Sequence, residues 1–196
     1  MFKTISAVLT LSFALAGCGA MMAQNPSSAL KPVNAVPDEV QSNLLLKGAD
    51  VTAYFTQGRY VQGSPEFSSR YQGVDFRFAS AQSKQLFDQS PEKFLPQYGG
   101  YCANGIMFGI PWGGDADRFR MVDGKLYIFG GQLSQDAFEL NLQPNIALAD
   151  RYWAEEVQGS NSFVQRAKRL VFKVPHYQTG EQQAQAVAQA KSRAKP

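Results

Sequence analysis

The chain has 196 residues, of which 44% are hydrophobic and 18% are charged. These values fit one soluble globular domain with a core and appendages, and they exclude a chain that is disordered throughout. The net charge of +3 is too small to indicate nucleic-acid binding. Residues 161 to 196 nevertheless hold seven Lys and Arg against one acid, Glu181, while residues 1 to 160 hold twelve against fifteen acids. A basic end of this kind is ordinarily a solvated tail, and contact with anionic lipid headgroups is the alternative.

The first twenty residues, MFKTISAVLTLSFALAGCGA, predict an export signal. Lys3 supplies a positive charge, and an apolar run follows from Ile5 to Ala16. This run is too short to span a bilayer as a helix, and small residues follow it, which is typical of a secretory signal. We therefore expect a signal peptide over residues 1–17 and an exported mature protein.

The end of this signal, Leu-Ala-Gly-Cys at residues 15–18, resembles the lipobox of bacterial lipoproteins. The resemblance implies that Cys18 becomes the lipidated first residue and that the protein contacts the membrane through this lipid. Gly19, where Asp would favour the inner membrane, implies the periplasmic face of the outer membrane. The alternative is ordinary cleavage after Ala20 or nearby. Residues 18–43 are rich in Pro, Ser, Asn and Ala and predict a flexible tether.

The stretch after Leu44 has the pattern of a folded α+β domain. VTAYFTQGRYV is rich in β-branched and aromatic residues, which predicts a strand that runs into a turn at Gly58. FSSRYQGVDFRFAS alternates around the Gln-Gly pair at residues 72–73, which predicts a β-hairpin. The Asp-Gly pair at residues 123–124 lies between two alternating apolar runs and predicts a second hairpin with a two-residue turn.

Short helices are expected between the two hairpins. Ser80 lies at an N-cap position ahead of AQSKQLFDQ, which predicts a helix of about ten residues with Leu86 and Phe87 facing inward. Ser90 as a cap and Pro91 at the first helical position predict a second short helix.

The C-terminal third predicts further helices. Residues 133 to 157 read as two helices broken at Pro144. Their expected core contacts are Phe138, Leu142, Ile146, Leu148 and Trp153. Residues 159–196 are expected to form a basic helical tail. Apolar residues recur at helical spacing from Phe163 to Val174, so we expect an amphipathic helix that packs its apolar face on the domain, with binding to a membrane surface as the alternative. The Gln/Ala-rich end predicts a frayed helix.

The segment YQGVDFRFASAQSKQLFDQSPEKFLPQYGGYCANG resembles a YHS domain, a small α+β module related to the metal-binding TRASH domains. The resemblance covers about residues 44 to 155 and is closest to the exported branch, in which a GGYC segment also follows the core. It implies a YHS-type domain over residues 44–158, built from β-hairpins and short helices, with the helical tail as a C-terminal extension. The two cysteines of metal-binding relatives correspond to Ala79 and Ser83, which offer no thiolate. The usual metal site of the superfamily is therefore absent.

Cys102 would be the single thiol of a mature chain lipidated at Cys18. Three interpretations stay open. The thiol packs as a small apolar side chain, or it binds a soft metal such as Cu(I) with Met107, Met121 or His176, or it is a nucleophile with His176 as its base. Phe108, Ile110 and Trp112 are core candidates that would also line an apolar pocket near this thiol.

The sequence as a whole favours a lipid-anchored binding module over an enzyme. Its partner would be a metal ion, a small molecule or another envelope protein, and no cofactor is indicated beyond copper or another soft metal at Cys102. A Cys102-dependent enzyme or thiol redox protein is one alternative. A purely structural envelope lipoprotein is the other.

Overall fold

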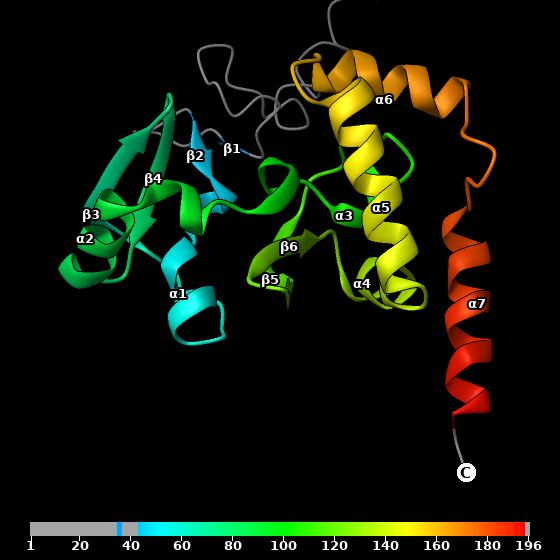
Figure 1. Ribbon diagram of the computed structural model, residues 1–196, viewed down its shortest axis with the longest axis horizontal. Helices are drawn as coiled ribbons and strands as arrows, with labels where there is room; N and C mark the ends of the chain where they lie inside the picture. The colour runs from blue at the N-terminus through cyan, green and yellow to red at the C-terminus, as the bar shows by residue number, and fades with distance from the viewer. Residues whose placement is uncertain (1–34, 37–42, 195–196) are drawn as a thin grey trace, which may run out of the picture.

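The computed structural model describes residues 35–36 and 43–194 and confirms an α+β fold (Figure 1). The predicted signal peptide, Cys18 and most of the tether lie outside the described residues. The described chain forms two hydrophobic cores side by side, and the hairpin nearest the middle of the molecule contributes to both.

The first core is covered by a four-stranded sheet with the order β1-β2-β4-β3. Its strands are β1 (Ala35–Val36), β2 (Leu44–Leu45), β3 (Ser64–Tyr71) and β4 (Val74–Phe78). β2 and β4 are parallel, whereas the other pairs are antiparallel. The predicted hairpin at residues 72–73 is confirmed, and both turn residues have positive φ, 49° at Gln72 and 79° at Gly73. This geometry matches the twist of the flanking strands.

The strand predicted over residues 51 to 61 is wrong, because this stretch begins with helix α1 (Val51–Thr56). Asp50 caps the helix: its Oδ1 accepts hydrogen bonds from the Thr52 amide at 2.9 Å and from the Thr52 hydroxyl at 2.7 Å. Val51 and Tyr54 are buried in the first core. The cap and the burial of one helix face outweigh the β propensity of the sequence.

Helix α2 (Ala81–Gln89) confirms the prediction at Ser80, whose Oγ accepts from the Ser83 amide at 3.1 Å. Phe87 is buried as expected, but Leu86 is 37% exposed. The next predicted helix is the single 3₁₀ turn η3 (Pro91–Phe94), which has Pro91 in its first turn but no side-chain cap from Ser90. Phe94 of this turn completes the first core.

Two left-handed turns meet between the cores. The first, η2 (Leu46–Gly48), has positive φ at all three residues, and the second lies in η4 (Gln97–Gly100), where φ is positive from Tyr98 to Gly100. A Cβ on Gly100 would lie 3.2 Å from Leu46 Cδ2, so glycine permits the close approach of the turns. This contact lies where the chain passes from the first core, which contains Phe94, to the second core, which contains Tyr98. Cys102 follows directly.

The second hairpin joins β5 (Asp115–Val122) to β6 (Lys125–Phe129). Asp123 and Gly124 have φ of 49° and 73°, which confirms the predicted two-residue turn. The buried residues of β6 belong alternately to the two cores. Leu126 and Ile128 belong to the first core, whereas Tyr127 and Phe129 belong to the second. Both faces of β6 are therefore buried, which explains its unbroken apolar run.

Helices α4 (Gln132–Glu139) and α5 (Leu142–Tyr152) cover the second core, and α5 continues into the π-helical turn η5 (Trp153–Val157). The predicted break at Pro144 is wrong, because the helices separate at residues 140–141 and Pro144 lies in the first turn of α5. There its missing N–H needs no intrahelical partner. Phe138 is fully buried, and the other expected contacts are partly buried against the same core.

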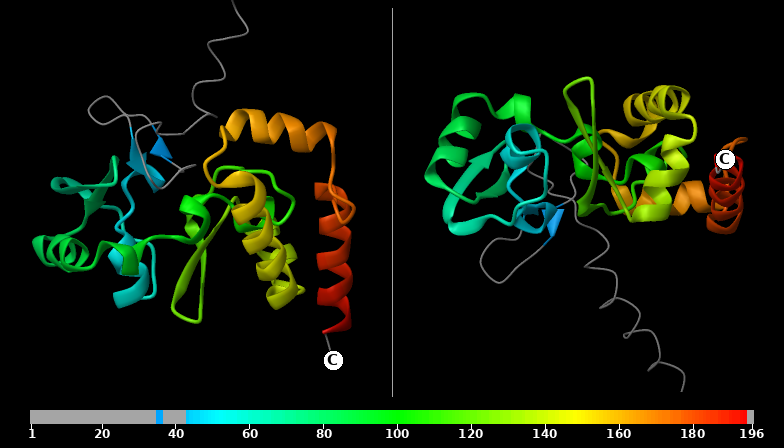
Figure 2. Two further views of the ribbon diagram at one scale, coloured as in Figure 1. Left: turned by 45° about the horizontal axis from the view of Figure 1, so that its top comes forward. Right: turned by 90° about the horizontal axis from the view of Figure 1, so that it is seen from below.

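The tail forms α6 (Ser162–Val171) and α7 (Gly180–Arg193), and both pack on the second half of the molecule. α6 crosses the end of α5, and α7 runs alongside α4 (Figures 1 and 2). Lys191 of α7 contacts Asp136 of α4 at 2.6 Å, and Val174 between the helices is buried in the second core. The tail therefore belongs to the fold and is not an appendage.

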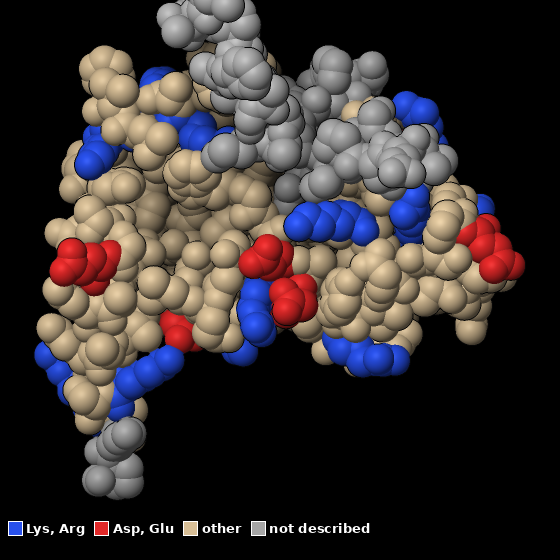
Figure 3. Space-filling view, turned by 180° about the vertical axis from the view of Figure 1, so that it is seen from behind, with Lys and Arg blue, Asp and Glu red and all other residues tan. Residues whose placement is uncertain are grey.

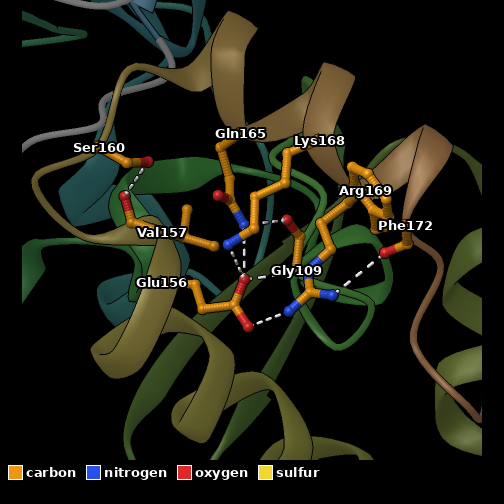
Figure 4. Close-up of polar contacts among 8 residues, drawn as sticks. All are labelled: Gly109, Glu156, Val157, Ser160, Gln165, Lys168, Arg169 and Phe172. Carbon is orange, nitrogen blue, oxygen red and sulfur yellow. Dashed lines mark hydrogen bonds and ion pairs between the residues drawn. The ribbon is translucent and has the colours of Figure 1, made fainter.

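The expected orientation of α6 is wrong. Its buried residues are Ser162, Gln165 and Arg166, which are polar, whereas Val164 and Val171 are 62% and 72% exposed. The polar face is held by specific bonds. Gln165 Nε2 donates to Gly109 O at 3.0 Å and to Glu156 Oε2 at 3.1 Å (Figure 4), and Arg166 donates to Pro111 O at 2.8 Å. These bonds outweigh the burial that the apolar face would have gained.

Candidate functional site: the Cys102 cavity

Cys102 lies at the start of α3 (Ala103–Ile106), where the chain passes beside β6. Its amide donates to Trp112 O at 2.9 Å, and the residue pairs with Ile128 in an isolated bridge. The carbonyl of Cys102 accepts from Gly105 and Ile106 at 2.9 and 3.0 Å. The backbone is thus fixed on both sides, and the thiol has a defined position.

The Cys102 side chain is only 3% exposed, and burial raises the pKa of its thiol. The backbone amides of Gly105, Gly130 and Asn104 and the hydroxyl of Ser134 act in the opposite direction, because their hydrogen bonds stabilise a thiolate. Burial has the larger effect, so the thiol is protonated at neutral pH. This environment suits a packed or ligand-contacting thiol better than a nucleophile, which needs a lowered pKa.

A cavity of about 260 Å³ adjoins the thiol. Its lining comes from α3, the loop before β5, the end of β6, α4 and the tail. The lining residues are Cys102, Asn104, Gly105, Phe108, Ile110, Trp112, Gly113, Gly130, Ser134, Tyr177, Gln178, Gly180 and Gln183. The apolar residues expected near Cys102 do line it, and a volume of this size equals that of roughly nine water molecules.

Among these lining residues there is no Asp, Glu, Lys, Arg or His. The polar side-chain groups of the lining residues are instead a thiol, two hydroxyls, an indole N–H and three amides. Asn104 is only 6% exposed, and its Nδ2 donates to Gln183 Oε1 at 3.1 Å. Its Oδ1 is buried and has no hydrogen-bond partner within the part of the chain that the structure describes. Such an acceptor is costly unless a donor reaches it.

The tail closes one side of this cavity through Tyr177, Gln178, Gly180 and Gln183. Sequence reasoning missed these residues and Ser134, because they lie far from Cys102 in the chain. No local signal marks them, although Thr179 forms a capping box with Gln182 and so predicts where α7 begins.

The proposed metal partners of Cys102 do not line the cavity. His176 Nε2 lies 2.8 Å from Met107 O, and its ring stacks on Phe108 with the centroids 5.7 Å apart. Met121 packs against the first core. In residues 35–36 and 43–194 no group of three or more His, Cys, Asp and Glu could hold a metal ion. A metal bound in the cavity would thus find one sulfur ligand and neutral amides.

Ala79 and Ser83, which the resemblance aligns with the cysteine pair of YHS relatives, have structural roles here. The Ala79 amide donates to Asp50 Oδ2 at 2.9 Å, which ties β4 to the cap of α1. The Ser83 hydroxyl lies 3.2 Å from the hydroxyl of Ser80. Asp50 is fully buried and its two carboxylate oxygens accept three hydrogen bonds, so this carboxylate serves the fold.

Within the described ranges, no helix is both long and apolar enough to cross a membrane. The chain matches no protein-family profile, no curated protein and no solved structure. The YHS-type assignment therefore stays a prediction that depends on the motifs quoted above.

Proposed function

We propose that this protein is an exported binding module that holds a small, uncharged molecule in the Cys102 cavity. The observation that carries the proposal is the cavity of about 260 Å³ beside Cys102, whose described lining combines apolar and uncharged polar side chains. A ligand can exchange hydrogen bonds with the side chains of Ser134, Gln178 and Gln183, which line the cavity. The side chains of Phe108, Trp112 and Tyr177 offer apolar surface for the rest of the ligand.

The lack of charged side chains among the described lining residues sets the class of ligand. A charged molecule would lose its hydration without gaining an opposite charge. A neutral molecule with a donor and a flat or apolar face loses much less. Monosaccharides and uncharged nitrogen heterocycles have this chemistry.

The lipid anchor and the family belong to the same proposal. Cys18 attaches the chain to the periplasmic face of the outer membrane, and residues 44–158 form a YHS-type domain that has lost its thiolate pair at Ala79 and Ser83. The lipobox-like residues 15–18 support the anchor. Intact mass of the envelope form tests it, because a chain that begins at an unmodified residue after Ala20 contradicts lipidation.

The other candidate functions fit the cavity less well. A Cys102 nucleophile or redox thiol is disfavoured because burial raises the pKa of the thiol. Copper would find a single soft ligand in the cavity. Elemental analysis of the wild-type protein and of Cys102→Ser tests whether a metal binds at Cys102. A purely structural lipoprotein leaves the cavity beside Cys102 without a role.

The binding proposal is tested by NMR on the side-chain amides of Asn104, Gln178 and Gln183, with a panel of monosaccharides and uncharged heterocycles as probes. We expect at least one probe to shift these signals in a saturable way. Ser134→Leu adds bulk at a residue of α4 that lines the cavity, and it should abolish the shifts. Ala81→Leu, at the exposed first position of α2, is the matched control and should keep them.

Two results would contradict the proposal. One is that no compound of the panel moves any of the three amide signals. The other is that the shifts persist in Ser134→Leu, which would place the binding outside the cavity.

A further inference from the structure

The outward face of α6 is apolar and exposed. Its exposed apolar residues are Phe163, Val164, Ala167, Leu170 and Val171, and the exposed Phe172 follows directly at the C-cap. These six residues are here called the apolar α6 face. Val171 and Phe172 are 72% and 69% exposed, which is unusual for large apolar side chains clustered at helical spacing. Isolated exposed apolar residues need no explanation, but a continuous stripe along a helix does.

α6 does not turn this face inward because its opposite face is locked. Gln165, Arg166 and Arg169 all bond to the domain, and Arg166 also lies over the Trp112 ring at 5.0 Å. Burial raises the pKa of Tyr101 to about 12, and the nearby Ser162 side chain offsets part of this effect. Rolling the helix over would break these bonds. The apolar α6 face is thus a fixed surface of the folded domain.

Basic side chains surround this face. Lys168 and Lys173 are exposed, and residues 157–180 contain no Asp or Glu. In the view from behind, Lys and Arg gather over α6 and the segment after it, whereas the acidic groups lie elsewhere on that face (Figure 3). Glu156 pairs with both Arg169 and Lys168, and its single negative charge leaves the surroundings of the face net basic.

An apolar helix face with flanking lysines is the pattern of helices that lie in the membrane interface. The apolar residues enter the boundary of headgroups and acyl chains, and the lysine stems extend to the anionic phosphates. A protein partner with an apolar groove would also cover the stripe, but the surrounding positive charge favours an anionic surface.

We infer that the apolar α6 face docks on the anionic lipid surface of the membrane. This inference uses the proposed anchor at Cys18 only for proximity. The seventeen peptide steps from Cys18 to Ala35 can span up to about 60 Å. β1 and α6 both lie in the upper half of the molecule in Figure 1, away from the C-terminal end of α7. Tethering gives an effective concentration in the millimolar range, so a weakly binding helix suffices.

The test uses the mature protein as recovered from the envelope and a tryptophan reporter at Phe172. Phe172→Trp is mixed with vesicles of phosphatidylcholine and phosphatidylglycerol in equal amounts, with or without lipids brominated near the headgroup. The signal of Trp112 and Trp153 in the wild-type protein is subtracted. We expect a blue shift and a quench by the brominated lipid several-fold larger than in Leu140→Trp, the matched control on α4–α5 with 40% exposure.

The lipid charge and the helix face are then varied. Pure phosphatidylcholine should reduce the quench, and Val171→Glu in the Phe172→Trp background should lower it to the level of the control. Equal quenching of Phe172→Trp and Leu140→Trp would overturn the inference. A blue shift without quenching by the brominated lipid would also overturn it. If that blue shift then depended on protein concentration, a second copy of the chain would cover the face. If it did not, another part of the same chain would cover it. Intact mass at Cys18 is measured separately, so failure of the anchor and failure of the docking are distinguishable.

Discussion

Arg169 and Glu156 form a two-pronged ion pair that joins α6 to the end of the α5 helix (Figure 4). Arg169 Nε donates to Glu156 Oε2 at 2.9 Å, and Nη2 contacts Oε1. The two side chains are 15% and 17% exposed, so the pair is sheltered from solvent on both sides. Lys168 also donates to this carboxylate at 3.1 Å. This cluster holds the polar face of α6 against the domain.

Loss of the pair should destabilise the protein measurably. In Arg169→Gln the bidentate contact disappears, and we expect a loss of about 1–3 kcal/mol in the free energy of unfolding. The control is Lys84→Gln, which removes the exposed pair with Asp88 on α2 and should cost no more than about 0.5 kcal/mol. Urea unfolding monitored by circular dichroism measures both. Equal, small losses in the free energy of unfolding would show that the sheltered pair stabilises the protein no more than the exposed pair does.

The contribution of Glu156 to the free energy of unfolding should decrease in acid. Burial raises the pKa of this carboxyl, but hydrogen bonds from Arg169, Gln165 and Lys168 outweigh burial and set the pKa below the ordinary value of 4.5. The stabilisation is complete above about pH 4.5 and is lost as the pH falls through the lower folded-state pKa. The stability difference between wild type and Glu156→Gln should therefore shrink below about pH 4. A difference that grows in acid would contradict this assignment.

The Cys102 thiol should resist alkylation in the folded protein. Because the side chain is buried and its pKa is raised, iodoacetamide should react only when the site opens transiently. We expect labelling at least a hundredfold slower than in urea, followed by mass spectrometry. Rapid labelling at neutral pH would contradict the packed environment described above and would revive the reactive interpretation.

Two glycines of the cavity wall should respond differently to alanine. A Cβ on Gly105 would lie 2.5 Å from Ile110 O, so Gly105→Ala must displace the loop before β5 and should cost about 1–3 kcal/mol. Gly180 begins α7 and its added Cβ meets no atom within 4 Å, so Gly180→Ala should be neutral or stabilise by up to about 1 kcal/mol. Thermal unfolding of the two variants compares them. If Gly105→Ala leaves the stability unchanged, the loop before β5 accommodates the added Cβ without cost.

The features predicted correctly from the sequence are local. The turn at Asp123 and the cap at Ser80 depend on residues within a few positions, and both are confirmed. The error at α1 has a different origin, because the strand pattern is strong there but the Asp50 carboxylate also bonds to Ala79, far along the chain. A contact between distant segments thus stabilises a helix that the local β propensity disfavours.

Periodicity also left the orientation of α6 undetermined. It correctly predicted an amphipathic helix, but it contains no information on which face meets the domain. That choice was made by Glu156 and by the carbonyls of Gly109 and Pro111, which accept from the polar face. The cavity at Cys102 was predictable in part, since Phe108, Ile110 and Trp112 are close in sequence. The side of the cavity that the C-terminal tail lines was not predictable.

The alternation along β6 has a consequence for cooperativity. Leu126 and Ile128 are aliphatic and enter one core, whereas the aromatic Tyr127 and Phe129 enter the other. Insertion of a single residue in this strand would exchange the two kinds of side chain and damage both cores together. Neither half of the domain can lose this strand and remain packed. Heat or denaturant should accordingly melt both halves in a single step, with one midpoint shared by probes placed on α2 and on α4.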